Sequence, residues 1–120
     1  MGKSIEASLV AWMNGPGAAL VGAPAYAARP SVVEGPLVTV ERTGGSSDPA
    51  AGIDRAMVAL RAWAPTRGAA LDLMADILCA VPEMEGEAEG VSSASVNSVA
   101  HLPLGDIESY QATVDLVSYI

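Results

Sequence analysis

The stretch from Ile53 to Val81 decides the fold, and it reads IDRAMVALRAWA, then PTRG, then AALDLMADILCAV. Its first part alternates between two kinds of side chain, as a half-buried β-strand does. One face of this strand carries Ala56, Val58, Leu60 and Ala62, and the other carries Arg55, Met57, Ala59, Arg61 and Trp63. The first face predicts close packing under a helix. The second predicts contact with water or with another surface.

A helix is expected to follow this strand and to pack on it. Thr66, in the turn at residues 65–68, is a suitable N-cap, and Pro82 predicts the end of the helix. Apolar side chains recur between them at helical spacing: Leu71, Met74, Ile77, Leu78 and Val81. Asp72 and Asp76 lie four residues apart and indicate the side of this helix that faces solvent. We therefore expect a helix at about residues 70–81, with the free Cys79 as a small buried side chain.

Further strands are predicted on both sides of this unit. Residues 37–43 alternate as a strand before it, and residues 91–102 and 109–120 alternate after it. An amphipathic helix opens the chain, where Ser4 can cap an apolar stripe of Ile5, Leu9, Trp12 and Met13. This helix either packs on the core or serves as an arm on a neighbour. The order predicts an α+β domain with an antiparallel four-stranded sheet, a helix packed on one face, and an N-terminal helix.

The connections between these elements differ in character. Residues 15–36 contain Pro16, Pro24, Pro30 and Pro36, which favour an extended connection. Residues 44–52 are polar and glycine-rich, and they are too many for an ordinary hairpin loop. They are either a tolerated insertion or a contact with a partner. Residues 83–89 alternate with glutamates and predict a solvated loop, since the spacing of a calcium loop is missing. The chain thus predicts one domain: residues 1–14 as a helix, 15–36 as a connection and 37–120 as an α+β core.

The composition excludes several classes of function. The chain has 120 residues and a net charge of −8, which argues against binding to nucleic-acid phosphates or to anionic membranes. No apolar run is long enough to span a bilayer, and an acid as early as Glu6 does not fit a secretory leader. One cysteine allows no internal disulfide, so a reducing compartment is expected. The core lacks Phe and is rich in Ala and Val, which favours additional burial against neighbours.

No set of residues predicts catalysis. His101 is the only histidine, and no motif links it to Cys79 or to a serine as a nucleophilic pair. We expect it at the surface or at a sheet edge. Zinc would need more Cys and His ligands than the chain has, and the glycine-rich phosphate-binding motifs are missing. We therefore expect no enzyme, no cofactor and no metal site.

The chain resembles the tail terminator proteins of long-tailed bacteriophages, the neck-region family related to lambda minor tail protein U. The resemblance extends over most of the chain from about Leu37 on. It is carried by the opening helix (Ile5 to Met13), the strand rich in Val and Ala (Arg55 to Trp63), the helical pattern from Ala70 to Val81, and the closing strings Pro103-Leu104 and Tyr110-Gln111-Ala112-Thr113-Val114-Asp115-Leu116. In that family the last strand often opens with an Arg-Tyr pair, and here Ser109 takes the place of the arginine.

The resemblance implies a structural virion protein that forms a homohexameric ring at the head-proximal end of a phage tail. Such a ring ends tube polymerisation and joins the tail to the capsid connector. The implied partners are further copies of the chain, the major tail (tube) protein, the head-tail connector or stopper protein, and genomic DNA that passes through the lumen without specific binding. The implied location is the virion, after synthesis in the host cytoplasm and without a membrane.

For the subunit or tail-tube interface, we single out the mixed face of the central strand and the loop before it. The residues are Arg55, Arg61, Trp63, Asp48, Ser46 and Ser47. Two alternatives remain at this point. The chain can be another phage neck or tail component, such as a head-closure or tail tube protein, or a small cytoplasmic α+β binding domain.

Overall fold

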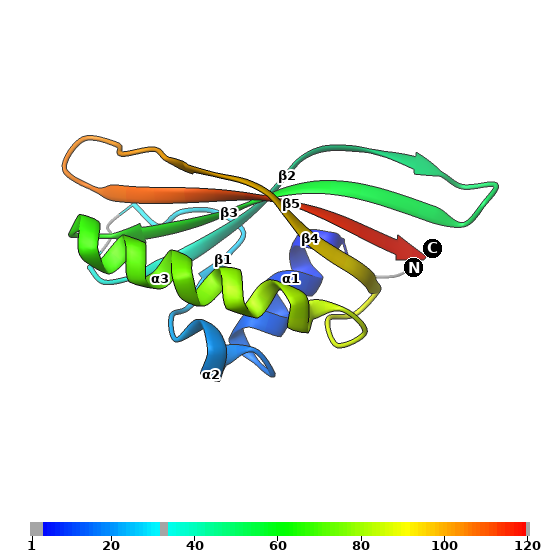
Figure 1. The fold of residues 1–120 in the computed structure, drawn as a ribbon, viewed down its shortest axis with the longest axis horizontal. Helices are drawn as coiled ribbons and strands as arrows, with labels where there is room; N and C mark the ends of the chain where they lie inside the picture. Colours follow the sequence, from blue (N-terminus) through cyan, green and yellow to red (C-terminus); the bar gives the residue numbers. More distant parts are fainter. Residues whose placement is uncertain (1–3, 32–33, 120) are drawn as a thin grey trace.

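The computed structural model describes residues 4–31 and 34–119, and it shows a five-stranded sheet with helices on one face (Figure 1). The elements in chain order are α1 (Ile5–Asn14), α2 (Ala18–Val21), β1 (Ala25–Tyr26), β2 (Leu37–Asp48), β3 (Ile53–Ala64), α3 (Arg67–Ala80), the 3₁₀ turn η1 (Val81–Met84), β4 (Val91–His101) and β5 (Glu108–Tyr119). The strand order is β1-β2-β3-β5-β4. The predicted α+β class is confirmed.

Strand β3 is the centre of the sheet. It pairs antiparallel with β2 on one side and, from Ile53 to Ala64, with β5 on the other. Its predicted inner face is buried in the core: Ala56, Val58, Leu60 and Ala62. Because these side chains are small, α3 can pack closely against β3 and β5.

Helix α3 has the predicted N-cap, but it runs from Arg67 to Ala80 rather than from about residue 70 to 81. The Thr66 Oγ1 accepts a hydrogen bond from the Ala69 backbone N–H at 3.2 Å, and Pro82 lies in η1 directly after the helix. The buried side chains of α3 are Ala70, Leu73, Met74, Ile77 and Ala80. Two predictions are wrong: Leu71 is 45% exposed and Cys79 is exposed. The helix is turned so that Leu73 flanks the buried stripe, and Cys79 lies two positions past Ile77, on the opposite side.

Helix α1 packs on the core of its own chain. The Ser4 Oγ accepts from the Ala7 backbone N–H at 3.1 Å, as a cap does. Leu9, Trp12 and Met13 are buried. A Cβ at Gly17 would lie 2.7 Å from the Trp12 ring, so a glycine is needed where the chain leaves α1.

The sheet differs from the predicted four antiparallel strands, because the predicted connection at residues 15–36 contains a helix and a strand in its described part, which leaves out residues 32–33. These are α2 and then β1, which pairs parallel with β2 through Ala25↔Val38 and Tyr26↔Thr39. The Asn14 side chain holds β1 in place: its Nδ2 donates to the Ala25 oxygen at 2.9 Å, and its Oδ1 accepts from the Ala25 N–H at 2.8 Å.

The predicted long loop at residues 44–52 is mostly strand. Strand β2 continues to Asp48, so the turn spans residues 49–52 only. A bulge between Arg42 and Gly44 shifts the register of the pairing, and such bulges bend the strand. At Gly45 the backbone has φ of 121°, and a Cβ there would lie 2.0 Å from the Arg55 oxygen. Glycine therefore allows the two strands to stay paired rather than separating into a loop.

The outer strand β4 is covered less than its neighbours. On β5 four alternating side chains are buried: Tyr110, Ala112, Val114 and Leu116. On β4, Val91 and Ala94 are buried, whereas Val96 and Val99 are exposed. Because α3 packs mainly on β3 and β5, the far half of β4 lies outside the core.

Candidate functional site

The face of the sheet opposite the helices is the candidate site. No described helix covers this face, which we call the open face (Figure 1). A hollow of about 380 Å³ lies on it, which we call the arginine–tryptophan hollow. Its lining comes from three strands and from the segment after β1: Ala27, Ala28, Arg29, Thr39, Glu41, Ala59, Arg61, Trp63 and Gln111.

Trp63 forms the floor of this hollow. Its side chain is only 4% exposed although no helix covers it. The guanidinium carbons of Arg61 and Arg29 lie 4.1 Å and 4.9 Å from the centre of its ring, which is cation–π distance. The indole Nε1–H donates to the Thr39 Oγ1 at 2.9 Å. Two arginines and a cross-strand hydrogen bond thus fix the ring in place.

Arg61 is held on both sides. Its Nε donates to the Ser109 Oγ at 2.9 Å and its Nη2 donates to the Leu102 oxygen at 2.8 Å. Ser109 in turn donates to the same Leu102 oxygen. Burial, and then the charge of Arg29, lowers the pKa of the Arg61 guanidinium. The two hydrogen bonds hold the Arg61 guanidinium at a fixed position, next to that of Arg29.

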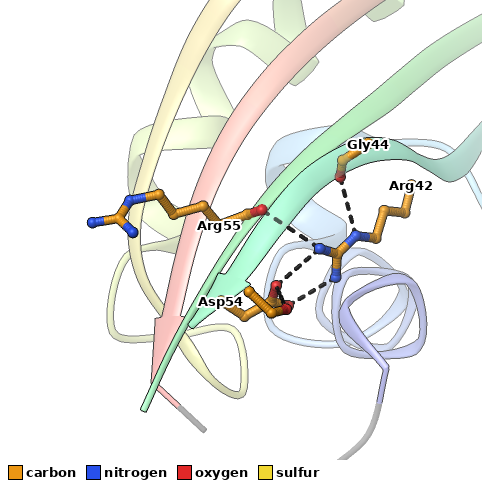
Figure 2. Close-up of polar contacts among 5 residues, drawn as sticks. Arg42, Gly44, Asp54 and Arg55 are labelled. Atoms are coloured by element: carbon orange, nitrogen blue, oxygen red, sulfur yellow. Dashed lines mark hydrogen bonds and ion pairs between the residues drawn. The ribbon is translucent and has the colours of Figure 1, made fainter. Parts of the chain in front are cut away.

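A separate polar cluster lies where β2 and β3 approach their turn. Arg42 and Asp54 form a two-pronged ion pair, with Nη1 and Nη2 each 2.8 Å from one carboxylate oxygen (Figure 2). Ser47 donates to Asp54 at 2.7 Å. These hydrogen bonds, from Arg42 first and then from Ser47, hold the pKa of Asp54 below its ordinary value. On the other side, the Glu6 carboxylate of α1 accepts from the Arg42 backbone N–H at 3.0 Å.

The six residues singled out from the sequence fall into two groups. Arg61 and Trp63 lie together in the hollow. Ser46, Ser47, Asp48 and Arg55 lie on the β2–β3 tip, by which we mean residues 44–55. Arg55 and Arg61 are six residues apart on β3, which is about 20 Å along a strand. The prediction therefore contains two surfaces rather than one.

The β2–β3 tip is exposed and extends past the helices (Figure 1). Figure 2 shows the Arg55 side chain pointing away from Arg42 and Asp54, while its carbonyl oxygen lies 3.5 Å from Arg42 Nη2. Ser47 is tied to Asp54, and the Asp48 carboxylate accepts from the Ala51 N–H in the turn at 3.2 Å. Arg55 is thus the charged side chain of this group that is directed outward.

Sequence reasoning missed three of the residues that build these surfaces. Arg29 comes from the proline-rich connection, where no periodicity indicates its position. Arg42 and Asp54 meet because β2 and β3 stay paired as far as Asp48↔Ile53, where the sequence predicts a loop. The alternation of β3 does place Arg61 and Trp63 on one face, and that part of the prediction needed no further signal.

His101 lies on the edge strand β4, as predicted. It is exposed, its Nε2 is 2.6 Å from a Glu108 carboxylate oxygen, and its ring stacks on Tyr110 at 4.7 Å. No group of three or more His, Cys, Asp or Glu side chains suited to a metal ion occurs in residues 4–31 and 34–119. In that same part of the chain, no helix has both the length and the apolar character needed to cross a membrane.

The chain was compared with known protein families and with curated proteins, and it matches none of them. The resemblance to tail terminators therefore remains a prediction from the sequence.

Proposed function

We propose that this chain is a structural subunit of a phage neck ring, which ends polymerisation of the tail tube and joins the tail to the capsid connector. The observation that carries the proposal, beside the resemblance, is the open face of the sheet. No described helix covers this face, which carries the exposed Met57 beside the arginine–tryptophan hollow and so leaves room for a second layer. Neighbouring subunits would supply that layer.

Exposed apolar side chains support the same assembly. Four of them lie on the second half of β4 and the turn after it, and one lies at the opposite end of the sheet: Val96, Val99, Leu102 and Leu104, and Tyr119. Together with the open face, they give one subunit more than one surface to bury. Subunits in a ring need two different contact surfaces, one for each neighbour.

The β2–β3 tip is suited to contact the tube. It extends past the helical layer and presents polar, exposed residues including Ser46, Asp48 and Arg55. Because both strands of the tip are paired through Asp48↔Ile53, this surface is held in shape rather than free to collapse. A paired, protruding hairpin can reach a component outside the ring without losing its own fold.

The charge of the chain agrees with DNA passing through a ring lumen. A net charge of −8 repels phosphates, so transit would not be slowed by non-specific binding. No reactive group lies in the hollow beyond two arginines and Glu41, which suits binding rather than catalysis.

The proposal is tested by deleting the gene for this chain from its source phage and imaging the particles by electron microscopy. We expect over-long tails without heads. Tails of normal length that lack heads would instead indicate a head-closure protein, and a loss of tubes would indicate a tube protein. Normal virions would contradict any role in the neck.

A further inference from the structure

Two positive charges of this acidic chain lie together in the arginine–tryptophan hollow. The chain has six basic residues and 14 acidic ones. Of the other described basic residues, Arg42 is paired with Asp54, Arg67 donates to the Tyr110 hydroxyl at 2.8 Å, and Arg55 stands alone on the β2–β3 tip. Arg29 and Arg61 both lie in the hollow, where Glu41 is the one acidic residue of the lining. The hollow is therefore a positive spot on a negative molecule.

The two guanidiniums are arranged in advance for an anionic partner. Both stack on Trp63, and Arg61 is fixed by Ser109 and the Leu102 oxygen. Arg61 Nη1 donates no hydrogen bond to any residue that the structure describes. The pKa of Arg61 is lowered first by burial and then by the charge of Arg29, and an incoming carboxylate would favour the charged form of both guanidiniums. Little side-chain entropy would be lost on binding.

A matching acidic segment lies on the same chain. The turn between α3 and β4 contains Glu83, Glu85 and Glu87, and we call residues 83–87 the acidic turn. Glu85 is tied to its own chain, since its Oε1 accepts from the Ala94 N–H at 3.0 Å. Glu83 and Glu87 are exposed. The acidic turn thus presents two carboxylates, and the hollow presents two guanidiniums.

The hollow and the acidic turn lie at opposite ends of α3. Trp63 precedes the start of the helix, and Glu83 follows its end (Figure 1). A helix of 14 residues is about 21 Å long, so one copy cannot place its own acidic turn in its own hollow. Two different surfaces at opposite ends of a subunit allow head-to-tail contact, which repeats from copy to copy.

We propose that the arginine–tryptophan hollow of one copy binds the acidic turn of the next copy. This docking proposal rests on the proposed function in one respect, since the contact would be one of those between neighbouring subunits of the ring. It names a second copy of this chain as the partner, with Glu83 and Glu87 as the groups that enter the hollow and Arg29 and Arg61 as the groups that receive them.

The test is charge reversal with rescue in the full chain, read by native mass spectrometry over a series of protein concentrations. We expect the unmodified chain to self-associate. Arg29→Glu and Glu87→Lys should each weaken self-association by about tenfold, as expected for a close intermolecular charge pair. The double variant Arg29→Glu with Glu87→Lys should recover to within about threefold of the unmodified chain, because the pair is then restored with reversed signs.

The control is Asp72→Lys, which reverses an exposed acid on α3 outside the acidic turn and should leave self-association within about twofold. Circular dichroism of each variant checks the fold, and recovery in the double variant excludes misfolding as the cause of the single losses. An unmodified chain that stays monomeric at every soluble concentration would overturn the proposal, as would single variants without effect or a double variant without recovery.

The outcome is separable from that of the proposed function. If the charge variants have no effect while gene deletion gives over-long tails, the docking proposal fails and the tail function stands. If the charge rescue succeeds while deletion leaves normal virions, the docking proposal stands and the tail function fails.

Discussion

Arg42 and Asp54 fasten the β2–β3 tip to the sheet. Their two 2.8 Å hydrogen bonds join strands across the bulge, and Ser47 adds a third bond to the same carboxylate. The exposed fractions of the two side chains are 33% and 14%, so water screens the pair only in part. A charge-assisted, two-pronged contact of this kind is stronger than an ordinary surface ion pair.

The first prediction concerns pH. The pKa of Asp54 is lowered in the folded protein. Its carboxylate therefore contributes fully to the free energy of unfolding above the ordinary pKa of 3.8, and this contribution is lost as pH falls through the lowered pKa. We expect Asp54→Asn to reduce the free energy of unfolding by about 1 kcal/mol at neutral pH and by much less in strong acid. Urea unfolding at both pH values measures this. Asp72→Asn is the control, and an equal loss from Asp54→Asn at both pH values would contradict the pairing.

The second prediction concerns the floor of the hollow. Thr39→Val removes the acceptor of the Trp63 Nε1–H and leaves this nearly buried donor unpaired. We expect a loss of about 1–2 kcal/mol in the free energy of unfolding. Thr113→Val is a matched control, since Thr113 lies half-buried on the next strand but one. Equal effects of the two substitutions in urea unfolding would show that the hydrogen bond contributes nothing.

The sequence predicts single residues well where alternation alone determines them. Arg61 and Trp63 share a face because they are two apart on a strand. The alternation does not reveal that Arg29 covers Trp63, because Arg29 belongs to a connection without any period. It also does not reveal that Ser109 and the Leu102 oxygen hold Arg61, because these contacts depend on how β3 and β5 pair.

At the scale of elements, α3 shows that a helix can be predicted correctly while its buried face is predicted wrongly. Its cap agrees with the prediction, yet Leu73 is buried where Leu71 was expected. Both leucines fit a helical period, and the rotation of the helix on the sheet decides between them. That rotation depends on β3 and β5, which a local pattern does not describe.

The third prediction follows from this rotation. Ile77→Asp places a carboxylate in the core without a partner, and we expect the domain to unfold, since such a cost of several kcal/mol approaches the whole stability of a small domain. Leu71→Asp makes the same kind of change on the exposed flank and should cost less than about 1 kcal/mol. Circular dichroism and thermal unfolding compare the two variants. Unfolding of both would place Leu71 in the core.

The β2–β3 tip shows a second limit at this scale. Glycine and serine at residues 44–47 have low strand propensity and favour a loop. They form strand because β3 is already paired with β5 and offers its other edge to β2. Tertiary pairing thus overrides local preference, and Gly45 is required by the close approach of the Arg55 oxygen.

The fourth prediction concerns the role of the tip. Arg55→Glu changes an outward-pointing side chain and should leave the thermal unfolding midpoint unchanged. If the tip contacts the tail tube, this variant should complement a deletion phage at least about tenfold less well than the unmodified chain. Asp72→Lys should complement fully. Full complementation by Arg55→Glu would show that Arg55 does not contribute to the contact with the tail tube.

At the scale of the whole molecule, the predicted α+β class is confirmed and the predicted sheet is incomplete. The pattern of β3, α3 and β5 is strong enough to indicate the central layer. Strand β1 is too short and too close to prolines to give a pattern, and only the Asn14 side chain and the edge of β2 make it a strand. The open face follows from the same architecture, since every described helix lies on the other side (Figure 1).

The proposed ring subunit would use an open face, exposed apolar side chains on β4 and a paired protruding tip as contact surfaces. We expect the chain to self-associate in solution and to form a six-membered ring. Native mass spectrometry should then give the mass of six copies.

The central claim is that this chain ends growth of a phage tail, and tail length after gene deletion tests it most directly. Electron micrographs of the deletion phage should show headless tails longer than those of the parent phage, with length restored when the chain is supplied in trans. Tails of parental length in the deletion phage would contradict the claim.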